Sequence, residues 1–246
     1  MPLWAPAGSR RAARAVAAPT ALAVVGVSSF NSSATSATFA GSLNPPANAD
    51  GALVLFVTRS NGASPAYAPA LTWAGLPATL LSENSAGVGD FGVITGAFLA
   101  RGALASAASF VLGDAVGFSL AMGASARAMG LDVLWLTGTR AETAKGAVTQ
   151  VRLTSSANNV SGAITPTDGS GLVVCLNALW AGSSPSVSSA TPSTGLIQAY
   201  SGIAGNSLGA RLVRYAVPSG TADLTSAVTF SQAGTSRGAL LLELIR

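Results

Sequence analysis

The sequence repeats one pattern of hydrophobic runs and turns, and this repetition constrains the fold more than any other feature. The segment 50–57, Asp-Gly-Ala-Leu-Val-Leu-Phe-Val, returns as the segment 169–176, Gly-Ser-Gly-Leu-Val-Val-Cys-Leu. Two further segments return in the same order, 91–99 as 208–216 and 107–111 as 226–230. The offset is nearly constant at about 110 to 120 residues, which is the length of one small domain. The 246 residues therefore predict two tandem copies of one fold.

The hydrophobic runs in both copies are typical of β-strands. They are short, rich in valine and leucine, and separated by Gly, Pro and Ser at intervals of about 8 to 12 residues. Leu53–Thr58 is apolar without alternation, which predicts a strand buried on both faces, and Leu172–Leu179 is its counterpart. Leu71–Leu80 alternates around Gly-Leu-Pro and predicts a hairpin. Ala21–Val27 and Leu131–Thr137 are expected to be the first strands of the two copies.

The expected fold is all-β, with two tandem antiparallel β-sandwich domains of jelly-roll type that arose by internal duplication, and an extended N-terminal arm. We expect the arm to span residues 1–19, the first sandwich 20–128 and the second 129–246. Because 49% of the residues are hydrophobic, each copy can form a core. Charged residues make up 9%, far below the roughly 25% of an ordinary soluble domain. So low a charge fits a surface that packs against neighbouring proteins.

The N-terminal arm matches neither copy. The residues expected to dock it on a partner are Pro2, Trp4, Pro6, Arg10, Arg11 and Arg14. The prolines keep the chain extended, and Trp4 lies outside both sandwiches, where an aromatic side chain is a good candidate to anchor a partner pocket. Two alternatives for the arginines are free solvation and contact with a polyanion. A phosphate-binding arm usually carries a longer basic run, so nucleic acid is not the expected partner.

No run reaches the ~18 to 20 uninterrupted apolar residues of a membrane-spanning helix, so no membrane span is expected. The nearest candidate, Ala15–Val27, is short and contains Pro19. An alternative interpretation of that segment is the hydrophobic region of a secretory signal, which would follow the arginines of the arm.

The sequence does not point to an enzyme. It contains no histidine, so the most common general base and metal ligand are missing from the chain. Residues 234–238 match Gly-x-Ser-x-Gly, but a strand is expected to follow where a nucleophile elbow needs a helix. Residues 87–92 match Gly-x-Gly-x-x-Gly and are also expected to lead into a strand, so we interpret them as a hairpin loop. The nine acidic residues leave open a loop calcium site or a carboxylate pair for glycoside cleavage, but no cofactor or metal is expected.

Several single residues have a structural and a functional interpretation. Asp50 and Asp168 occupy related positions before the two central strands, where Asp is a common turn residue. Cys175 lies in an apolar run and is expected to be a buried core side chain. The tryptophans of the sandwiches are expected to anchor the cores, with a sugar-stacking platform as the alternative for one of them. These are Trp73, Trp135 and Trp180.

Three segments have a recognisable sequence. They are Ala-Leu-Thr-Trp-Ala-Gly-Leu-Pro at 70–77, Gly-Thr-Ala-Asp-Leu-Thr-Ser-Ala-Val-Thr-Phe at 220–230, and Gly-Ala-Leu-Leu-Leu-Glu-Leu at 238–244. In this order they resemble β-sandwich modules of structural proteins from tailed phages and phage-derived gene transfer agents. The resemblance covers residues 20–246, although the second copy has no clear counterpart of Leu71–Pro77. It implies a jelly-roll or immunoglobulin-like sandwich, assembly into a particle and a position on the particle exterior.

We therefore expect a non-enzymatic virion protein, such as a head spike, fibre base or decoration component, attached through its arm to the capsid or to neighbouring spike or fibre proteins. A homo-oligomer is expected from the usual symmetry of such assemblies, and a host surface polysaccharide is a further expected contact. The alternative is a secreted or cell-surface carbohydrate-binding β-sandwich module.

Overall fold

A computed structural model of the chain describes most of its residues after the N-terminal segment. The described ranges are 21–62, 66–86, 88–89, 92–101, 115–168, 171–181, 185–191, 196–203, 209–216 and 220–246. Within these ranges the chain forms fifteen β-strands and no helix. The strand pairs found there are antiparallel. The predicted all-β, antiparallel fold class is therefore confirmed.

The first unit is a pair of layers that share two long strands. Its strands are β1 (Ala23–Leu43), β2 (Gly51–Ser60), β3 (Ala70–Trp73), β4 (Leu76–Pro77), β5 (Thr79–Glu83), β6 (Val93–Arg101) and β7 (Val116–Thr137). The larger layer contains, in order, β5, β6, β2, the C-terminal half of β7 and the N-terminal half of β1. The smaller layer contains β4, β3, and the other halves of β7 and β1. Trp73, Phe118 and Trp135 pack together in the core between these layers.

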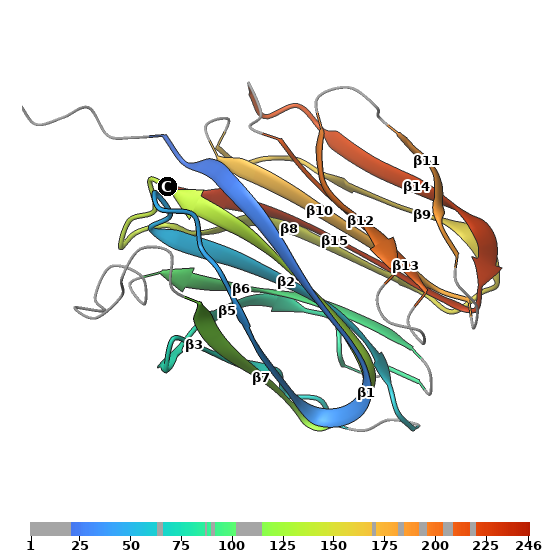
Figure 1. The fold of residues 1–246 in the computed structure, drawn as a ribbon. Coiled ribbons are helices and arrows are strands. Elements are labelled where there is room, and N and C mark those ends of the chain that lie inside the picture. Colours follow the sequence, from blue (N-terminus) through green and yellow to red (C-terminus); the bar gives the residue numbers. More distant parts are fainter. Residues whose placement is uncertain are drawn as a thin grey trace, which may run out of the picture.

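The strands β1 and β7 pass from one layer to the other by bending together, as the long curved ribbons of Figure 1 show. β7 pairs with β2 over residues 126–136 and with β3 over residues 118–121. Gly123, which lies between these stretches, has a φ of +75°, a conformation that glycine adopts without strain. β1 follows β7 around the bend, with register shifts within residues 32–38. Two strands thus serve both layers of the first unit.

The second unit builds its two layers from separate strands. These are β8 (Ala144–Leu153), β9 (Ala157–Ile164), β10 (Leu172–Trp180), β11 (Val187–Thr191), β12 (Ile197–Ile203), β13 (Ala210–Ala216), β14 (Leu224–Gly234) and β15 (Ser236–Ile245). The larger layer has the order β12-β13-β10-β15-β8, and the smaller layer has the order β11-β14-β9. Cys175, Leu212, Phe230 and Leu241 are among the buried residues between these layers.

The two units have the same strand order. In the larger layers β5-β6-β2-β7-β1 corresponds to β12-β13-β10-β15-β8, and in the smaller layers β3-β7-β1 corresponds to β11-β14-β9. Two of the repeated sequence segments fall on corresponding strands, one on β2 and β10 and another on β6 and β13. The third repeated segment, 107–111, lies outside the described residues.

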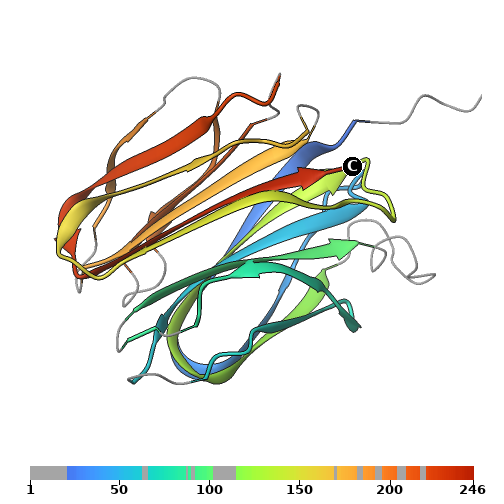
Figure 2. The same cartoon turned by 180° about the vertical axis from the view of Figure 1, so that it is seen from behind.

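The larger layers of the two units pack face to face, so the molecule is a stack of four β layers. Figures 1 and 2 show the blue-to-green unit lying against the yellow-to-red unit from both sides. One buried hydrophobic cluster joins them, with Leu53, Leu55, Leu99, Leu134 and Leu136 among its members from the first unit. Its members from the second unit include Leu172, Val174, Leu176, Leu240, Leu242 and Leu244. Hydrophobic burial therefore continues through both units without a solvent layer between them.

The central strands β2 and β10 lie in the middle of this stack. All ten residues of β2 are buried, and in β10 every residue before Trp180 is buried. Leu53 and Leu55 face the second unit, whereas Val54 and Phe56 face the core of the first. A strand covered on both faces needs apolar side chains at successive positions, which explains the unbroken hydrophobic runs. The prediction that Leu53–Thr58 is buried on both faces is confirmed.

The strand pairings place the division between the units later than the sequence predicts. Leu131–Thr137 is not the first strand of the second unit but the end of β7, where it pairs with β1 and β2. The predicted boundary between residues 128 and 129 therefore lies inside β7, and the second unit begins with β8. Hydrophobic spacing could not separate these cases, because the last strand of one copy and the first strand of the next are both short apolar runs.

The predicted hairpin around Gly75 is confirmed, with a tighter turn than Gly-Leu-Pro. β3 and β4 pair directly across Ala74 and Gly75. The φ angles of these two residues are +49° and +79°, and positive φ at both central residues is the mark of a type I′ turn. This turn has the twist that suits antiparallel strands, and Gly75 provides one of its two left-handed positions.

In each unit, one carboxylate links the loop before the central strand to the end of that unit. The carboxylate is buried in the second unit and half-buried in the first. Glu243 in β15 is fully buried and accepts hydrogen bonds from the backbone N–H groups of Ala147, Thr167 and Asp168, each at 2.9 Å. In the first unit, Asp50 accepts from the backbone N–H groups of Gly138 and Thr139 at 2.8 and 3.1 Å. Burial raises the pKa of Glu243, but the hydrogen bonds outweigh this effect and hold the pKa below its ordinary value.

The lowered pKa of Glu243 predicts a loss of stability in acid. A carboxyl group with a lower pKa in the folded state stabilises the fold above its unfolded pKa, and that stability is lost as the pH falls through the folded pKa. We therefore expect the free energy of unfolding to decrease as the pH falls below 4.5, which is the ordinary pKa of a glutamate carboxyl group. Glu243→Gln should lower stability at pH 7 by about 1–3 kcal/mol, because a charged acceptor is replaced, and should flatten the acid limb. Urea titrations of both proteins between pH 3 and pH 7 measure this. If both proteins lose the same free energy of unfolding as the pH falls, Glu243 is not the cause of the loss in acid.

Candidate functional site

The interface between the units contains a buried ion pair. Arg211 of β13 and Asp132 of β7 are 0% and 1% exposed. The Nε of Arg211 donates to Oδ2 of Asp132 at 2.5 Å and its Nη2 donates to Oδ1 at 2.9 Å, which is a two-point contact between a guanidinium and a carboxylate. The hydroxyl of Ser29 donates to the same carboxylate at 2.6 Å, and Nη1 of Arg211 donates to Oδ1 of Asn31 at 2.8 Å. Both charges are thus neutralised and hydrogen-bonded inside the stack.

This polar cluster fixes how the two units face each other. Asp132, Ser29 and Asn31 belong to the first unit, whereas Arg211 belongs to the second. A one-residue slip of β13 would turn Arg211 away from Asp132 and leave two buried charges unpaired, because successive side chains of a strand point to opposite faces. Sequence reasoning did not select Asp132 or Arg211. The available signal was a charged residue inside each of two apolar runs, Leu131–Leu136 and Ala210–Val213.

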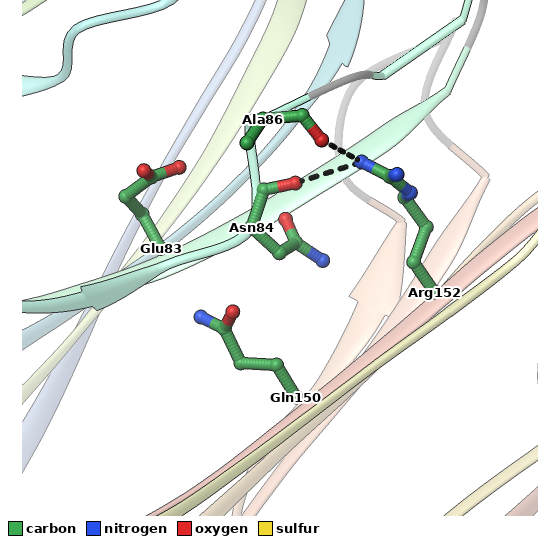
Figure 3. Close-up of a pocket in the computed structure, with 5 residues that line it drawn as sticks. All are labelled: Glu83, Asn84, Ala86, Gln150 and Arg152. Carbon is green, nitrogen blue, oxygen red and sulfur yellow. Dashed lines mark hydrogen bonds between the residues drawn. The ribbon is translucent and has the colours of Figure 1, made fainter.

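A polar hollow lies where the edge of the first unit meets the edge of the second. It has a volume of about 330 Å³ and is lined by Glu83, Asn84, Ala86, Gln150 and Arg152. Glu83 is the last residue of β5 and Asn84 and Ala86 follow it, whereas Gln150 and Arg152 lie on β8. Figure 3 shows the side chains of Gln150 and Arg152 rising from β8 towards the β5 side.

Hydrogen bonds across the junction hold this hollow in shape. Nη1 of Arg152 donates to the carbonyl oxygens of Asn84 at 3.1 Å and Ala86 at 2.8 Å, the two dashed lines of Figure 3. Nε2 of Gln150 donates to the hydroxyl of Ser82 at 2.9 Å. Further along the same edge, Nζ of Lys145 donates to the carbonyl oxygen of Leu81 at 2.9 Å. These bonds all join β8 to β5 or to the residues just after it, so the hollow exists only when the units are stacked.

Of the predicted docking residues and tryptophans, some lie outside the described residues, two lie in the core of the first unit and one lies between the units. The docking residues Pro2, Trp4, Pro6, Arg10, Arg11 and Arg14 lie outside the described residues. Trp73 and Trp135 are fully buried, which confirms them as core anchors and rules out a sugar-stacking role for either. Trp180 is partly buried on the face that meets the first unit, with the guanidinium of Arg59 4.4 Å from the centre of its ring. This contact is a cation–π interaction between the units.

Both sequence motifs considered for catalysis lead into strands. Ser236, the serine of Gly-x-Ser-x-Gly, is 4% exposed and its hydroxyl accepts a hydrogen bond from the backbone N–H of Val93 at 2.8 Å. The strand β15 begins at Ser236 inside this motif, and β6 begins directly after the glycine motif at 87–92, so each motif leads into a strand, as the sequence predicts. The carboxylate of Asp50 accepts from three donors around Gly138 and Thr139, which agrees with its interpretation as a turn residue. Among the described side chains, no group of three or more Cys, Asp or Glu residues is placed to hold a metal ion.

The predicted burial of Cys175 is confirmed, and it implies an unreactive thiol. The side chain is 0% exposed in the core of the second unit. Burial raises the pKa of this thiol to about 12, an effect that the neighbouring Arg214 and Ser226 reduce only in part. The native protein at pH 8 should therefore react with a disulfide reagent such as 5,5′-dithiobis(2-nitrobenzoic acid) at least about 100-fold more slowly than the same protein in 6 M guanidinium chloride. Equal rates in the two conditions would contradict the burial of Cys175.

Comparisons with known proteins identify no relative. No protein-family model matches the chain, and neither a curated protein nor a solved structure matches it. In the part of the chain that the structure describes, no helix is long and apolar enough to cross a membrane.

Proposed function

We propose that this chain is a non-enzymatic structural protein of a tailed-phage or gene transfer agent particle, as a head spike, fibre-base or decoration component. The observation that supports this most is the face-to-face packing of two β units through a shared hydrophobic cluster and the buried Asp132–Arg211 pair. A particle component that positions other proteins must keep one shape when force acts on it. A stack with a continuous core and a register-fixing ion pair meets this requirement. The resemblance of residues 20–246 to phage β-sandwich modules favours the same assignment.

We infer that each unit is a jelly roll and that the pair arose by duplication of one ancestral sandwich. The strand orders of the two units, which match apart from the extra edge strand β4 of the first, and the position of two repeated segments on corresponding strands support this. The division between the copies then falls at residues 138–143, between β7 and β8, and both copies end on a strand that pairs beside the central strand.

Attachment to the particle is assigned to the N-terminal arm, residues 1–19. Trp4 and the prolines would enter a pocket of the capsid or of a neighbouring spike or fibre protein, and Arg10, Arg11 and Arg14 would pair with its acidic groups. The stacked units would then project from the particle exterior, in a homo-oligomer if the attachment point is symmetric.

The experiment that tests this function is mass spectrometry across a density gradient of particles from producing cells. We expect the chain to co-migrate with DNA-filled particles at a fixed ratio to the major capsid protein. A variant lacking residues 1–19 should keep the circular dichroism spectrum and thermal midpoint of the full chain and yet be missing from the particles. If the full chain stays out of the particle fractions, the virion role is wrong. If the truncated chain enters the particles normally, the docking role of the arm is wrong.

The second candidate is a secreted or cell-surface carbohydrate-binding module. The observation that favours it is the polar hollow at the β5–β8 junction, which has the size and lining of a small binding site. The same gradient separates the two candidates, because this module would be found in the envelope or medium of the producing cells.

A further inference from the structure

The lining of the β5–β8 hollow selects for a particular chemistry of ligand. It combines one carboxylate, one guanidinium and two carboxamides, from Glu83, Arg152, Asn84 and Gln150. The charges of Glu83 and Arg152 cancel. An anion entering the hollow would meet the carboxylate and a cation would meet the guanidinium, so neither is favoured. The one apolar side chain in the lining is the small methyl group of Ala86, which leaves little for a hydrophobic ligand to contact.

The class of ligand that fits this lining is a neutral molecule rich in hydroxyl groups. A hydroxyl group both donates and accepts, so it can pair with an acceptor such as Glu83 and with a donor such as Arg152. Carboxylate, carboxamide and guanidinium groups each present two polar atoms in one plane, and neighbouring hydroxyls on a sugar ring offer a matching pair. The hollow, at about 330 Å³, lies at the small end of the about 300–1,000 Å³ typical of ligand pockets, which suits one or two sugar rings.

The wall of the hollow also contains an unused donor. Oδ1 of Asn84 accepts a hydrogen bond from the backbone N–H of Thr95 at 2.7 Å, which fixes the orientation of the carboxamide. Nδ2 of the same side chain is buried and has no acceptor within the described part of the protein. Buried polar groups are nearly always paired, so this donor adds to the polar character of the wall, but it is covered and is not itself exposed to a ligand in the hollow.

The opposite junction of the stack has exposed hydrophobic side chains among its described residues. In the larger layers, β1 of the first unit corresponds to β8 of the second, and β5 corresponds to β12. The edge strands β8 and β5 meet at the hollow, and the edge strands β1 and β12 meet at the opposite junction. The exposed side chains at that junction include Val27 on β1 and Ile197 on β12, which are 38% and 58% exposed. The described residues of the two junctions therefore differ, with exposed hydrophobic side chains on β1 and β12 and the polar set on β5, β8 and the residues after β5.

We propose that the β5–β8 hollow binds one or two rings of a neutral glycan. This inference rests on the proposed function, for which it names the ligand class that a particle component would contact on a host surface. The site is composite, since Glu83 and Asn84 come from the first unit and Gln150 and Arg152 from the second. Hydrogen bonds from Arg152 to two carbonyl oxygens pre-organise it. Because the hollow is small and polar, we expect weak affinity for one site, with a Kd of about 0.1–1 mM.

The test uses the full chain and a panel of defined probes. Saturation-transfer NMR and isothermal titration would be run with maltose, cellobiose, lactose, N-acetylglucosamine and mannobiose, and with sialyllactose as an acidic probe. We expect at least one neutral sugar to bind and sialyllactose to bind no better than lactose. Glu83→Gln and Gln150→Ala should each weaken the neutral sugar at least 5-fold without changing the thermal midpoint by more than about 3 °C. Arg140→Gln, a matched change at an exposed ion pair with Glu142, should leave the affinity unchanged.

The outcomes separate this inference from the proposed function. The glycan site is wrong if no neutral sugar binds, if the acidic probe binds most tightly, or if Glu83→Gln and Gln150→Ala bind the sugar as the unchanged protein does. A chain that is found in particles but binds none of the sugars loses the glycan site and keeps the virion role. A chain that binds a neutral sugar through Gln150 but stays out of the particles keeps the site and loses the virion role.

Discussion

Asp132→Ala is expected to lower the free energy of unfolding by about 3–5 kcal/mol, which is the usual effect of removing one partner from a buried ion pair. The substitution leaves the guanidinium of Arg211 buried without a counter-charge, because Arg211 is 0% exposed and Asp132 supplies two of its hydrogen bonds. Urea unfolding followed by tryptophan fluorescence measures the change.

A paired substitution serves as the control for Asp132→Ala. The double variant Asp132→Leu with Arg211→Met removes both charges and fills the space with apolar side chains, so it should recover most of the stability lost in the single variant. If the single and double variants are equally unstable, the loss comes from packing around residue 132 and the ion pair does not fix the interface. A single variant as stable as the unchanged protein would show that Arg211 is not buried.

Either unit expressed alone is expected to be unable to persist as a soluble monomer. Residues 21–137 alone would expose Leu53, Leu55 and Leu134, and residues 138–246 alone would expose the leucines of β15 that now face them. Each such side chain contributes about 1.5–3 kcal/mol when buried. Summed over the buried leucines that the first unit contributes to the cluster, the loss is comparable with the about 5–15 kcal/mol by which a typical domain is stable. Size-exclusion chromatography of each half should therefore show aggregates or self-associated species, since a large exposed apolar face drives association.

Co-expression provides the control for the isolated halves. If the stacked face is the cause, the two halves produced together should form a soluble 1:1 complex with the circular dichroism spectrum of the full chain. A half that elutes as a folded monomer and unfolds cooperatively would show that the inter-unit cluster is dispensable for that unit.

The sequence predicts the repeated β organisation well because hydrophobic periodicity is a local signal. The unbroken apolar run Leu53–Thr58 correctly indicates a strand covered on both faces, and Leu71–Leu80 correctly indicates a hairpin, although its turn lies at Ala74 and Gly75 and not at Gly-Leu-Pro. The same run contained a further signal. A strand of an isolated antiparallel sandwich needs a polar side chain at alternate positions, and neither central strand has them. Two such runs in one chain are the expected consequence of two units that cover each other.

The candidate site could not be predicted, because its residues meet only in the fold. Gln150 and Ser82 are bonded across 68 residues of sequence, and Arg211 and Asp132 across 79. Local patterns give each residue a strand and a face, but the pairing of strands from different units depends on how whole layers pack. For the same reason the sequence placed Leu131–Thr137 in the wrong unit, since its partners β1 and β2 lie far away along the chain.

Differential scanning calorimetry of the full chain tests most directly whether the two units form a single body. With a shared hydrophobic cluster and a buried ion pair between them, we expect one transition whose calorimetric enthalpy equals its van't Hoff enthalpy. Asp132→Ala should move that whole transition to lower temperature. Two resolved transitions, or one for which the calorimetric enthalpy is about twice the van't Hoff value, would mean that the units unfold independently, and the account of a stacked, composite molecule would be wrong.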